Sequence, residues 1–405
     1  MKLGIVTAYP PSKVTLNEYA YHLVKHFRQL EEVSEIILYT DIEDGVADIS
    51  FTEMGCPIRV VSCWKFNSYA NIATVTKALI RTKPDMVLFN LQFMKFGSSK
   101  VPAALGLFLP WISKRLNIPT IVLLHNIMET VDLGEVGFAK NRLASRIYNG
   151  IGTFLTKIVL KANKVAVTIQ KYVGELESKY LVNNVILIPH GTFEIPEIPT
   201  YDKVNEVTRI MTFGKFGTYK KVEALIEAMM IIRERTGESV ELVIAGTDNP
   251  NCKGYLEAVK KQYEHVPDVH FTGYVEEEEV PRLFVESDIV VFPYTATTGS
   301  SGVLHQAGSY GKAAVMPNLG DLASLVQDEG YRGEFFEPSN TQSMADAIEK
   351  LILNDTYRKE LAKANYKAAS SWPMIRVASK YIEEFESLGP SKEGSFIKSI
   401  LTYFL

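Results

Sequence analysis

Short apolar runs alternate with longer amphipathic stretches along most of the chain. This alternation is typical of βαβ units, in which helices cover a parallel sheet. Residues 16–30 are such a helical stretch, because Leu16, Ala20, Leu23 and Phe27 recur on one face at helical spacing. In the first half of the chain, the apolar runs predict strands at residues 3–9, 35–41, 58–63, 86–91, 120–126, 164–170 and 185–191.

The pattern breaks over residues 191–205, where prolines and polar residues lack periodicity. The alternation then resumes. It predicts further strands at residues 209–215, 241–247, 268–274, 288–294, 313–319 and 333–339. Two successive doubly wound units favour an α/β fold of two Rossmann-like domains whose parallel sheets face each other across a cleft. In such sheets, ligands bind at the carboxyl ends of the strands.

Length and composition agree with this organisation. A chain of 405 residues is long for a single core, which favours two domains. The net charge of −4 does not indicate nucleic-acid binding. Three cysteines without C-x-x-C spacing, and an N-terminal run that resembles a first strand more than a signal peptide, indicate a cytoplasmic protein. We expect an N-terminal domain at 1–192, a linker at 193–206, a second domain at 207–372, and C-terminal helices at 373–405 that pack back on the first domain.

The second domain opens with a strand, a basic loop and a helix that starts at Val222. We expect the strand to end at Phe213 and the loop to begin at Gly214, so that Lys215 and Lys220 both lie on the loop. Cations on a loop that enters a helix N-terminus form a site for a phosphate or diphosphate. A solvated turn is the alternative.

A loop rich in glycine and hydroxyl groups follows the strand at 288–294 and then becomes helical. The backbone amides of residues 299–302 suit phosphate or sugar oxygens at a helix N-terminus. The acidic run at 276–279 predicts a different feature, the first turn of the helix that includes Pro281 and Phe284. Acids in a first turn are stabilised by the helix dipole.

These motifs, in this order, resemble the GT-B glycosyltransferases, in particular the large retaining family 4, over nearly the whole chain. No single motif is specific, whereas their shared order and spacing are. The motifs are Pro10 and Pro11 after the first strand, the turn at 188–191, Gly214 and Lys215 with Lys220, Ala245 and Gly246, residues 271–274, residues 288–293, and the loop and helix at 297–315.

The resemblance implies transfer of a sugar from a nucleotide diphosphate donor to an acceptor hydroxyl with retention of configuration. It implies that Lys215 and Lys220 grip the donor diphosphate, and that a donor phosphate helps to deprotonate the acceptor. Because the sequence has no Asp-x-Asp between apolar strands, we expect neither a metal nor another cofactor, and the nucleotide sugar is a co-substrate. The residues expected to bind the donor are Gly214, Thr298, Gly299, Ser300, Ser301, Gly302, Val303 and Gln306.

The chain departs from the family at a pair of glutamates that are separated by seven residues. The matching positions are Thr298 and Gln306, and neither is acidic. Gln306 can hydrogen-bond ribose hydroxyls without a charge, whereas Thr298 cannot place a carboxylate near the anomeric carbon. Three accounts remain: a subfamily that uses hydroxyls there, a changed donor, or a lost activity. We favour the first, because the other site features are present.

In the first domain, His125 and Asn126 end an apolar strand. The resemblance implies that His125 contacts the donor sugar or the acceptor, and a structural histidine is the alternative. The loop before the first helix has Val14 and Thr15 where the family commonly has a glycine pair, and Asn17 and Glu18 follow at the start of the helix. We expect Thr15, Asn17 and Glu18 on the acceptor side, together with Asn126. Glu18 can equally be a first-turn acid that the helix dipole stabilises.

Two other histidines have open roles. His190 is expected as a hinge residue near the cleft floor, with a role in the site as the alternative. His305 lies beside Gln306 and is expected either to pack or to make a contact on the ribose side.

Residues 140–164 carry several basic residues and no acid. A basic amphipathic helix can lie on an anionic membrane, so this stretch predicts either a solvated face or a peripheral contact with the inner face of the membrane. The tail at 394–405 leaves a similar choice between a docked helix and a membrane contact. Residues 101–112, interrupted by Pro110, are too short to span a membrane and predict one core helix.

The expected partners are a nucleotide sugar and a sugar, lipid-linked or small-molecule acceptor, without nucleic acid. A non-catalytic nucleotide-sugar-binding or scaffold protein of the same fold is the main alternative. A sugar-nucleotide epimerase shares the two-domain fold, but it needs acids and a histidine for proton abstraction. A periplasmic-type binding protein also has two such lobes, and the N-terminus argues against it.

Overall fold

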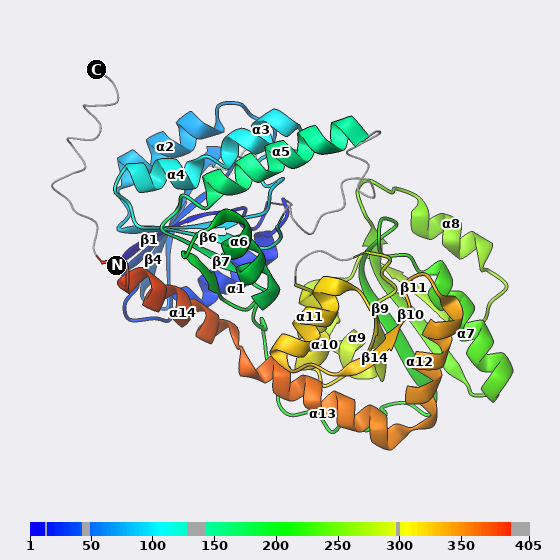
Figure 1. Cartoon of the computed structure of the whole chain (residues 1–405). Helices are drawn as coiled ribbons and strands as arrows, with labels where there is room; N and C mark the ends of the chain where they lie inside the picture. Colours follow the sequence, from blue (N-terminus) through cyan, green and yellow to red (C-terminus); the bar gives the residue numbers. More distant parts are fainter. Residues whose placement is uncertain (13, 43–48, 128–141, 297–299, 390–405) are drawn as a thin grey trace. The chain divides into compact units, whose positions relative to one another are not determined.

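The computed structural model describes residues 1–12, 14–42, 49–127, 142–296 and 300–389, with the backbone alone at 142–148. The chain forms two compact α/β units (Figure 1). Unit 1 consists of Met1–His190 and the C-terminal part from Met374, and unit 2 is Gly191–Pro373.

Unit 1 contains an eight-stranded sheet in the order β3-β4-β2-β1-β5-β6-β7-β8. Its strands pair in parallel, except that β3 is antiparallel to β4. The strands are β1 (Lys2–Val6), β2 (Glu35–Asp41), β3 (Ile49–Glu53), β4 (Cys56–Trp64), β5 (Met86–Leu91), β6 (Thr120–Leu124), β7 (Lys164–Val167) and β8 (Val185–Leu187). Every strand predicted in this half is present. The sequence does not predict β3, because this edge strand is mostly exposed and lacks the buried apolar run of the others.

Helices cover the sheet of unit 1, and Figure 1 shows α2, α3, α4 and α5 grouped together. The helices are α1 (Asn17–Phe27), α2 (Asn71–Thr82), α3 (Lys100–Gly106), α4 (Leu109–Arg115), α5 (Arg142–Val159), α6 (Gln170–Tyr180) and α14 (Met374–Glu386). The single core helix expected at 101–112 is wrong, since α3 and α4 are separate helices. Pro110 explains the break: its ring would clash with the carbonyl of Gly106 in a continuous helix, but a proline is tolerated in the first turn of α4.

The stripe of apolar residues on α1 is buried. Ala20, Leu23 and Phe27 are at most 1% exposed. Leu16 precedes the helix in a left-handed conformation, with φ 73°, so the helix starts later than expected. α14 packs against α1, and the rings of Phe27 and Tyr381 lie 6.2 Å apart. α14 therefore completes the core of unit 1.

Unit 2 contains a six-stranded sheet in the order β11-β10-β9-β12-β13-β14, with parallel pairing throughout the described strands. The strands are β9 (Thr208–Phe216), β10 (Val240–Asp248), β11 (Val269–Gly273), β12 (Ile289–Val291), β13 (Ala313–Pro317) and β14 (Gly333–Phe336). The strands predicted in the second half are all present. The stretch between Leu187 and Thr208 contains neither a helix nor a strand.

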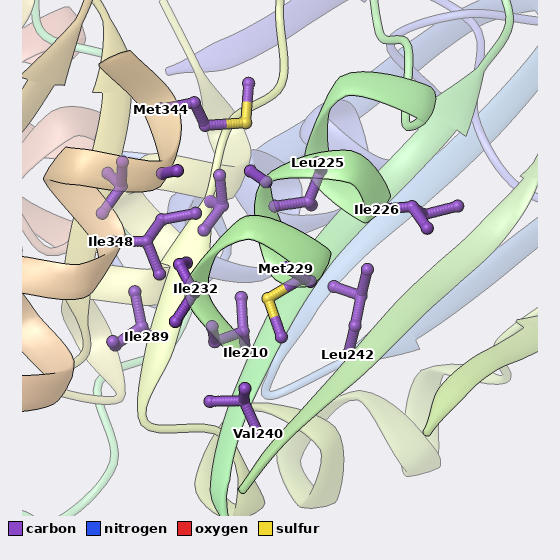
Figure 2. Packing of buried hydrophobic residues seen from close by; sticks show 14 of the residues in the cluster. Ile210, Leu225, Ile226, Met229, Ile232, Val240, Leu242, Ile289, Met344 and Ile348 are labelled. Atoms are coloured by element: carbon purple, nitrogen blue, oxygen red, sulfur yellow. The ribbon is translucent and has the colours of Figure 1, made fainter. Parts of the chain in front are cut away.

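The helices of unit 2 enclose this sheet. They are α7 (Glu223–Thr236), α8 (Tyr255–Gln262), the 3-10 helix η2 (Glu277–Glu279), α9 (Val280–Glu286), α10 (Gly302–Ser309), α11 (Gly320–Glu329), α12 (Thr341–Leu353) and α13 (Asp355–Ser371). Figure 2 shows the core in which Ile210 of β9, Leu242 of β10 and Ile289 of β12 meet Met229 of α7 and Ile348 of α12. Each such side chain contributes about 1.5–3 kcal/mol on burial, so the sheet is a firm support for the loops at its ends.

Two local expectations in unit 2 are corrected. β9 continues to Phe216, so Lys215 lies on the strand, paired with Thr247, and not on a loop. The glutamates at 277–279 form η2 ahead of α9, instead of the first turn of that helix. Pro281 lacks an N–H and sits in the first turn of α9, so the α-helix cannot extend back through the glutamates.

Candidate functional site

Backbone hydrogen bonds join the turn that carries Lys220 to the segment that follows β12. Lys220 forms an isolated β-bridge with Tyr294, and the amide of Lys221 donates to the carbonyl of Pro293 at 3.1 Å. The Lys220 side chain passes over Gly214, where an added Cβ would lie 2.8 Å from Nζ. Gly214 also has φ 142°, which disfavours other residues. The glycine therefore makes room for the ammonium at the carboxyl end of β9.

Aromatic rings surround this ammonium. Lys220 Nζ lies 4.7 Å from the ring centre of Tyr294 and 5.9 Å from that of Tyr219. Burial lowers the pKa of Lys220 from its usual value, and Tyr219 partly opposes this. Within the described part of the chain, no carboxylate forms an ion pair with Lys220. A partly desolvated cation with aromatic support but no acid is suited to an anionic ligand.

Tyr294 also connects Lys220 to the N-terminus of α10. Burial raises the pKa of Tyr294, and a hydrogen bond with Ser301 lowers it. Ser301 is the N-cap of α10, and its side chain accepts from the amide of Leu304 at 3.4 Å. The first-turn amides of Gly302 and Val303 have no acceptor within the helix. The structure thus brings Lys220 and these donors around one tyrosine.

The remaining donor-side residues are placed less closely. Ser300 Oγ lies 2.9 Å from His305 Nε2. Gln306 is half-buried on α10, and none of the described residues hydrogen-bonds its side-chain amide. Lys215 is exposed and forms no ion pair with a described residue. Thr298 and Gly299 lie outside the described residues.

In unit 1, Asn90 of β5 connects three segments. Its Nδ2 donates to Thr7 Oγ1 at 3.0 Å and to the carbonyl of Leu16 at 3.5 Å. Thr7 Oγ1 itself donates to the carbonyl of Ala8, so it accepts from Asn90. Asn90 Oδ1 is then the acceptor for His125 Nε2, at 2.7 Å. This pattern assigns the ring proton of His125 to Nε2 and leaves Nδ1 as an acceptor.

His125 is kept neutral by its surroundings. Burial lowers its pKa well below the usual value, and His190 and Lys95 lower it further. The Tyr19 ring lies 4.7 Å from that of His125 and 4.8 Å from that of His190. Beside His125, Asn126 Oδ1 is buried and has no hydrogen-bond partner among the described residues. A neutral imidazole next to an unsatisfied amide oxygen provides acceptors for hydroxyl groups.

Side-chain hydrogen bonds hold the loop between β1 and α1. Asn17 Nδ2 donates to the carbonyl of Ser12 at 2.6 Å, and Ser12 Oγ donates to Asp41 Oδ2 at 2.6 Å. Asn17 thus shapes its own loop. Thr15 is exposed, and its carbonyl accepts from Lys95 Nζ at 2.7 Å. Glu18 is exposed in the first turn of α1, where the helix dipole stabilises an acid.

Lys95 is a residue that sequence reasoning missed. It is 1% exposed, and its ammonium lies 5.7 Å from the Trp64 ring centre. Burial lowers its pKa to about 7, although Asp41 opposes the shift. Its indication in the sequence was a lone lysine among the apolar residues of the stretch 93–96, shortly after β5. Among the described residues, no cluster of three His, Cys, Asp or Glu is suited to hold a metal ion.

Comparisons with known proteins place part of the chain in a sequence family. Residues 207–354 match the protein-family model for Glycosyl transferases group 1. An uncharacterized glycosyltransferase of Methanocaldococcus jannaschii is 28% identical over 169 residues, which are 41% of this chain and 42% of that protein. The chain therefore matches less than half the length of this curated relative.

Solved structures resemble the whole chain. Sucrose-phosphate synthase from Thermosynechococcus elongatus has a TM-score of 0.71 and 15% identity, with 96% of this chain and 99% of that chain covered. The Anabaena protein HepE, in complex with UDP-glucose, has a TM-score of 0.63 and 14% identity, with 96% and 100% covered. The predicted GT-B fold class, two α/β domains with parallel-strand sheets, is confirmed. Together with the family match, this supports a GT-B glycosyltransferase.

Proposed function

We propose that the chain moves a sugar from a UDP- or GDP-sugar to an acceptor hydroxyl with retention, as a hexosyltransferase in glycoconjugate or polysaccharide synthesis. The observation that carries this proposal is the environment of Lys220. Its ammonium has no carboxylate partner among the described residues and lies against Tyr294, which also contacts the N-cap of α10. This arrangement lies within the part of the chain that matches the glycosyltransferase family.

In the proposed reaction, the acceptor oxygen bonds to the anomeric carbon as the bond from that carbon to the donor phosphate breaks. The electron pair of the broken bond stays on the diphosphate, and the acceptor proton passes to an oxygen of the same phosphate. Negative charge develops on the phosphate oxygen of the broken bond before the proton arrives, and a cation and hydrogen-bond donors stabilise this charge. Lys220 provides the cation, and Ser300, Gly302 and Val303 provide the donors. The exposed Lys215 adds positive potential at the same strand end.

This chemistry accounts for the absence of acids in the donor loop. Because a donor phosphate takes the proton, the protein needs no carboxylate base at that step. Thr298 can then contribute a hydroxyl, and Gln306 can hydrogen-bond the ribose through its unpaired amide. Closure around the donor excludes water and favours transfer over hydrolysis.

On the acceptor side, we assign His125 to a hydroxyl of the transferred sugar or of the acceptor. The assigned tautomer leaves Nδ1 free to accept from that hydroxyl. Asn126 Oδ1 offers a second acceptor. We also assign Thr15, Asn17 and Glu18 to the acceptor side: Thr15 precedes α1, the other two lie in its first turn, and Lys95 holds the Thr15 carbonyl.

A direct test uses Lys220→Ala with Lys221→Ala as the matched control. Lys221 is the next residue and is exposed, so its loss removes an equal charge from the surface. Binding of UDP and GDP is measured by calorimetry, and donor turnover is measured with UDP- and GDP-sugars. We expect Lys220→Ala to lose most binding and turnover and Lys221→Ala to keep both. Near-normal turnover of folded Lys220→Ala would show that the diphosphate lies elsewhere.

One observation favours a second function. Thr298 and Gln306 stand where the family has glutamates, which is compatible with a non-catalytic nucleotide-sugar-binding protein. That protein would bind UDP or GDP tightly and show neither transfer to any acceptor nor hydrolysis of the donor. The same calorimetry and turnover measurements separate the two functions.

We further propose that the chain is cytoplasmic and that α5 and the segment after it contact the inner face of the membrane. Ile151 and Phe154 of α5 are 47% and 53% exposed. Lys161 and Arg115 each place a charge 5.4 Å from the Trp111 ring centre. Exposed apolar groups beside cations suit an anionic bilayer surface. No helix in the described ranges has the length and apolar character to cross a bilayer, while residues 140–141 and 394–405 lie outside the described residues.

A further inference from the structure

A second support for the turn at 217–221, the lysine turn, comes from α8. The amide of Val222, which follows this turn as the N-cap of α7, donates to the Tyr255 hydroxyl at 2.8 Å. The same hydroxyl donates to the Glu223 carboxylate. Burial, and then Glu223, raises the pKa of Tyr255, so the hydroxyl keeps its hydrogen for this bond. One tyrosine thus binds both residues at the start of α7.

The start of α7 depends on this hydroxyl because it has no cap of its own. Its N-cap residue is Val222, whose side chain has no hydrogen-bond acceptor. Val222 is 0% exposed, so water cannot replace a lost partner of its amide. A buried amide without an acceptor is costly. We therefore expect the start of α7, and the lysine turn before it, to move when the Tyr255 hydroxyl is removed.

The ring of Tyr255 also packs against the lysine turn. Gly217 begins the turn with φ 108°, and an added Cβ there would lie 3.0 Å from Tyr255 Cγ. The Gly217 amide donates to the carbonyl of Lys220 at 2.9 Å, which closes the turn. Through its ring, Tyr255 therefore restrains the residue where the turn begins, and through its hydroxyl it restrains the residue that follows the turn.

The start of α8 is fixed to the sheet, which gives Tyr255 a firm position. Asp248 ends β10 and pairs with Phe216 of β9. Asp248 Oδ2 accepts from the Gly254 amide at 2.6 Å, and Oδ1 accepts from the Leu256 amide at 2.8 Å. These two amides lie on either side of Tyr255 in the chain. The position of the tyrosine is thus set by the carboxyl end of β10, the neighbour of β9.

We propose that Tyr255 is a positioning residue for the donor diphosphate: it holds the lysine turn so that the Lys220 ammonium stays over Gly214. The inference rests on the proposed function, since it needs a diphosphate at Lys220. Backbone bonds to the segment after β12 restrain the middle of the turn, and Tyr255 restrains its two ends. Tyr255 is not a catalytic residue, because it reaches the donor only through the turn.

A second tyrosine provides a matched control. Tyr263, at the end of α8, donates to Glu227 Oε1 of α7 at 2.6 Å. Glu227 lies about one helical turn beyond Glu223, further from the lysine turn. Tyr255→Phe and Tyr263→Phe therefore each remove one tyrosine–glutamate hydrogen bond between the same two helices. Only the first also leaves the amide before α7 without its acceptor.

The experiment measures the Kd of UDP and, by competition, of uridine on the full chain, or of GDP and guanosine where UDP does not bind. The nucleoside has no phosphate, so its affinity reports on the rest of the nucleotide site. We expect Tyr255→Phe to bind the diphosphate about tenfold more weakly, because Lys220 shifts with the turn, and to keep the nucleoside affinity. Tyr263→Phe should keep both affinities. Urea unfolding should show a similar loss of stability in the two variants.

Three results would overturn the inference and leave the proposed function in place. The first is an unchanged UDP affinity in folded Tyr255→Phe, and the second is an equal loss of that affinity in Tyr263→Phe. The third is a parallel loss of nucleoside affinity in Tyr255→Phe, which would show general damage to the fold. Absence of nucleotide binding by the wild type would overturn the proposed function, and the inference with it.

Gly217→Ala takes the place of Tyr255→Phe should that variant not fold. Its methyl group would meet the Tyr255 ring, so the turn and the ring must separate, and we expect the same selective loss of UDP affinity. Gly237→Ala, at the other end of α7, controls for backbone strain, since its φ is 68° and nothing lies within 4 Å of its added Cβ. An equal UDP affinity of these two glycine variants would overturn the inference.

Discussion

Lys220 Nζ lies 4.7 Å from the ring centre of Tyr294, and backbone pairing between the same two residues fixes their separation. The ring belongs to the segment that follows β12 and the ammonium to the turn after β9, and these two strands are neighbours in the sheet. Because Tyr294 also hydrogen-bonds Ser301, one side chain sets the distance between the cation and the N-terminus of α10. The tyrosine is therefore as important to the proposed diphosphate site as the lysine.

Replacing Tyr294 tests this arrangement. Tyr294→Leu removes the ring beneath the ammonium, and we expect the Kd of UDP to rise about tenfold, in keeping with a partly desolvated cation–π contact. Tyr294→Phe is the matched control, because it keeps the ring and loses only the hydroxyl contact with Ser301. Calorimetry on both variants gives the comparison. Equal losses in the two variants would assign the effect to the hydroxyl and not to the ring.

A methyl group at Gly214 is expected to displace the ammonium. The added Cβ would lie 2.8 Å from Lys220 Nζ, at a backbone φ of 142°. Gly214→Ala should therefore weaken UDP binding at least tenfold and lower the stability of the protein by about 1–3 kcal/mol. Gly237→Ala provides the control for backbone strain, since its φ is 68° and nothing lies within 4 Å of its added Cβ. That variant should lose stability, measured by urea unfolding, and keep its affinity for UDP.

The strands were predictable from sequence because burial leaves a local pattern. Runs such as 36–39 and 86–89 are apolar over consecutive residues and lie within β2 and β5. The same local pattern placed the end of β9 too early, because Lys215 is polar although it pairs with Thr247 in the sheet. An exposed edge strand such as β3 leaves no pattern of this kind.

The candidate site was predictable only in part, for a related reason. Lys220 and the loop before α10 follow strands directly, so their neighbourhood can be inferred from the order of elements. Lys95 bonds to a residue eighty positions away, and Asn90 to one eighty-three positions away, and such contacts exist only after folding. The approach of Tyr255 to Val222 has the same origin. The roles of all these residues in binding stay predictions.

The buried Lys95 predicts an unusual dependence of stability on pH. Its pKa is about 7 in the folded protein, whereas lysine in an unfolded chain titrates near pH 10.4. Between these values the unfolded chain binds the extra proton, so the free energy of unfolding rises with pH, by at most about 1.4 kcal/mol per pH unit. Lys95→Met lacks this rise and should be the more stable protein at pH 7. Lys77→Met, on the exposed face of α2, is the control.

Urea unfolding of these proteins at pH 7, 8 and 9 gives the measurement. The difference in the free energy of unfolding between Lys95→Met and the wild type should shrink as the pH rises. The same difference for Lys77→Met should stay constant. A constant difference for Lys95→Met as well would mean that the ammonium keeps its ordinary pKa in the fold.

The exposed face of α5 predicts binding to anionic membranes. Phe154 and Lys157 are both exposed, and Lys161 lies just beyond the end of α5. Each lysine near an anionic surface contributes about 1 kcal/mol, so Lys157→Glu should lower the partition coefficient onto phosphatidylglycerol vesicles at least fivefold. Phe154→Asp removes the apolar part and should have an effect of similar size. Tyr69→Asp, at another exposed aromatic residue of unit 1, should change nothing.

Salt separates the two contributions to this binding. Surface charge is screened within about 10 Å at 0.1 M ionic strength, whereas apolar insertion is not. Co-sedimentation at low and high salt should therefore show a strong salt dependence in the wild type and a weak one in Lys157→Glu, with little binding to phosphatidylcholine in either. Two results would contradict this prediction: equal binding to neutral and anionic vesicles, or unchanged vesicle binding in both Lys157→Glu and Phe154→Asp. Either would mean that α5 presents an ordinary solvated face. The acceptor would then reach the protein from solution.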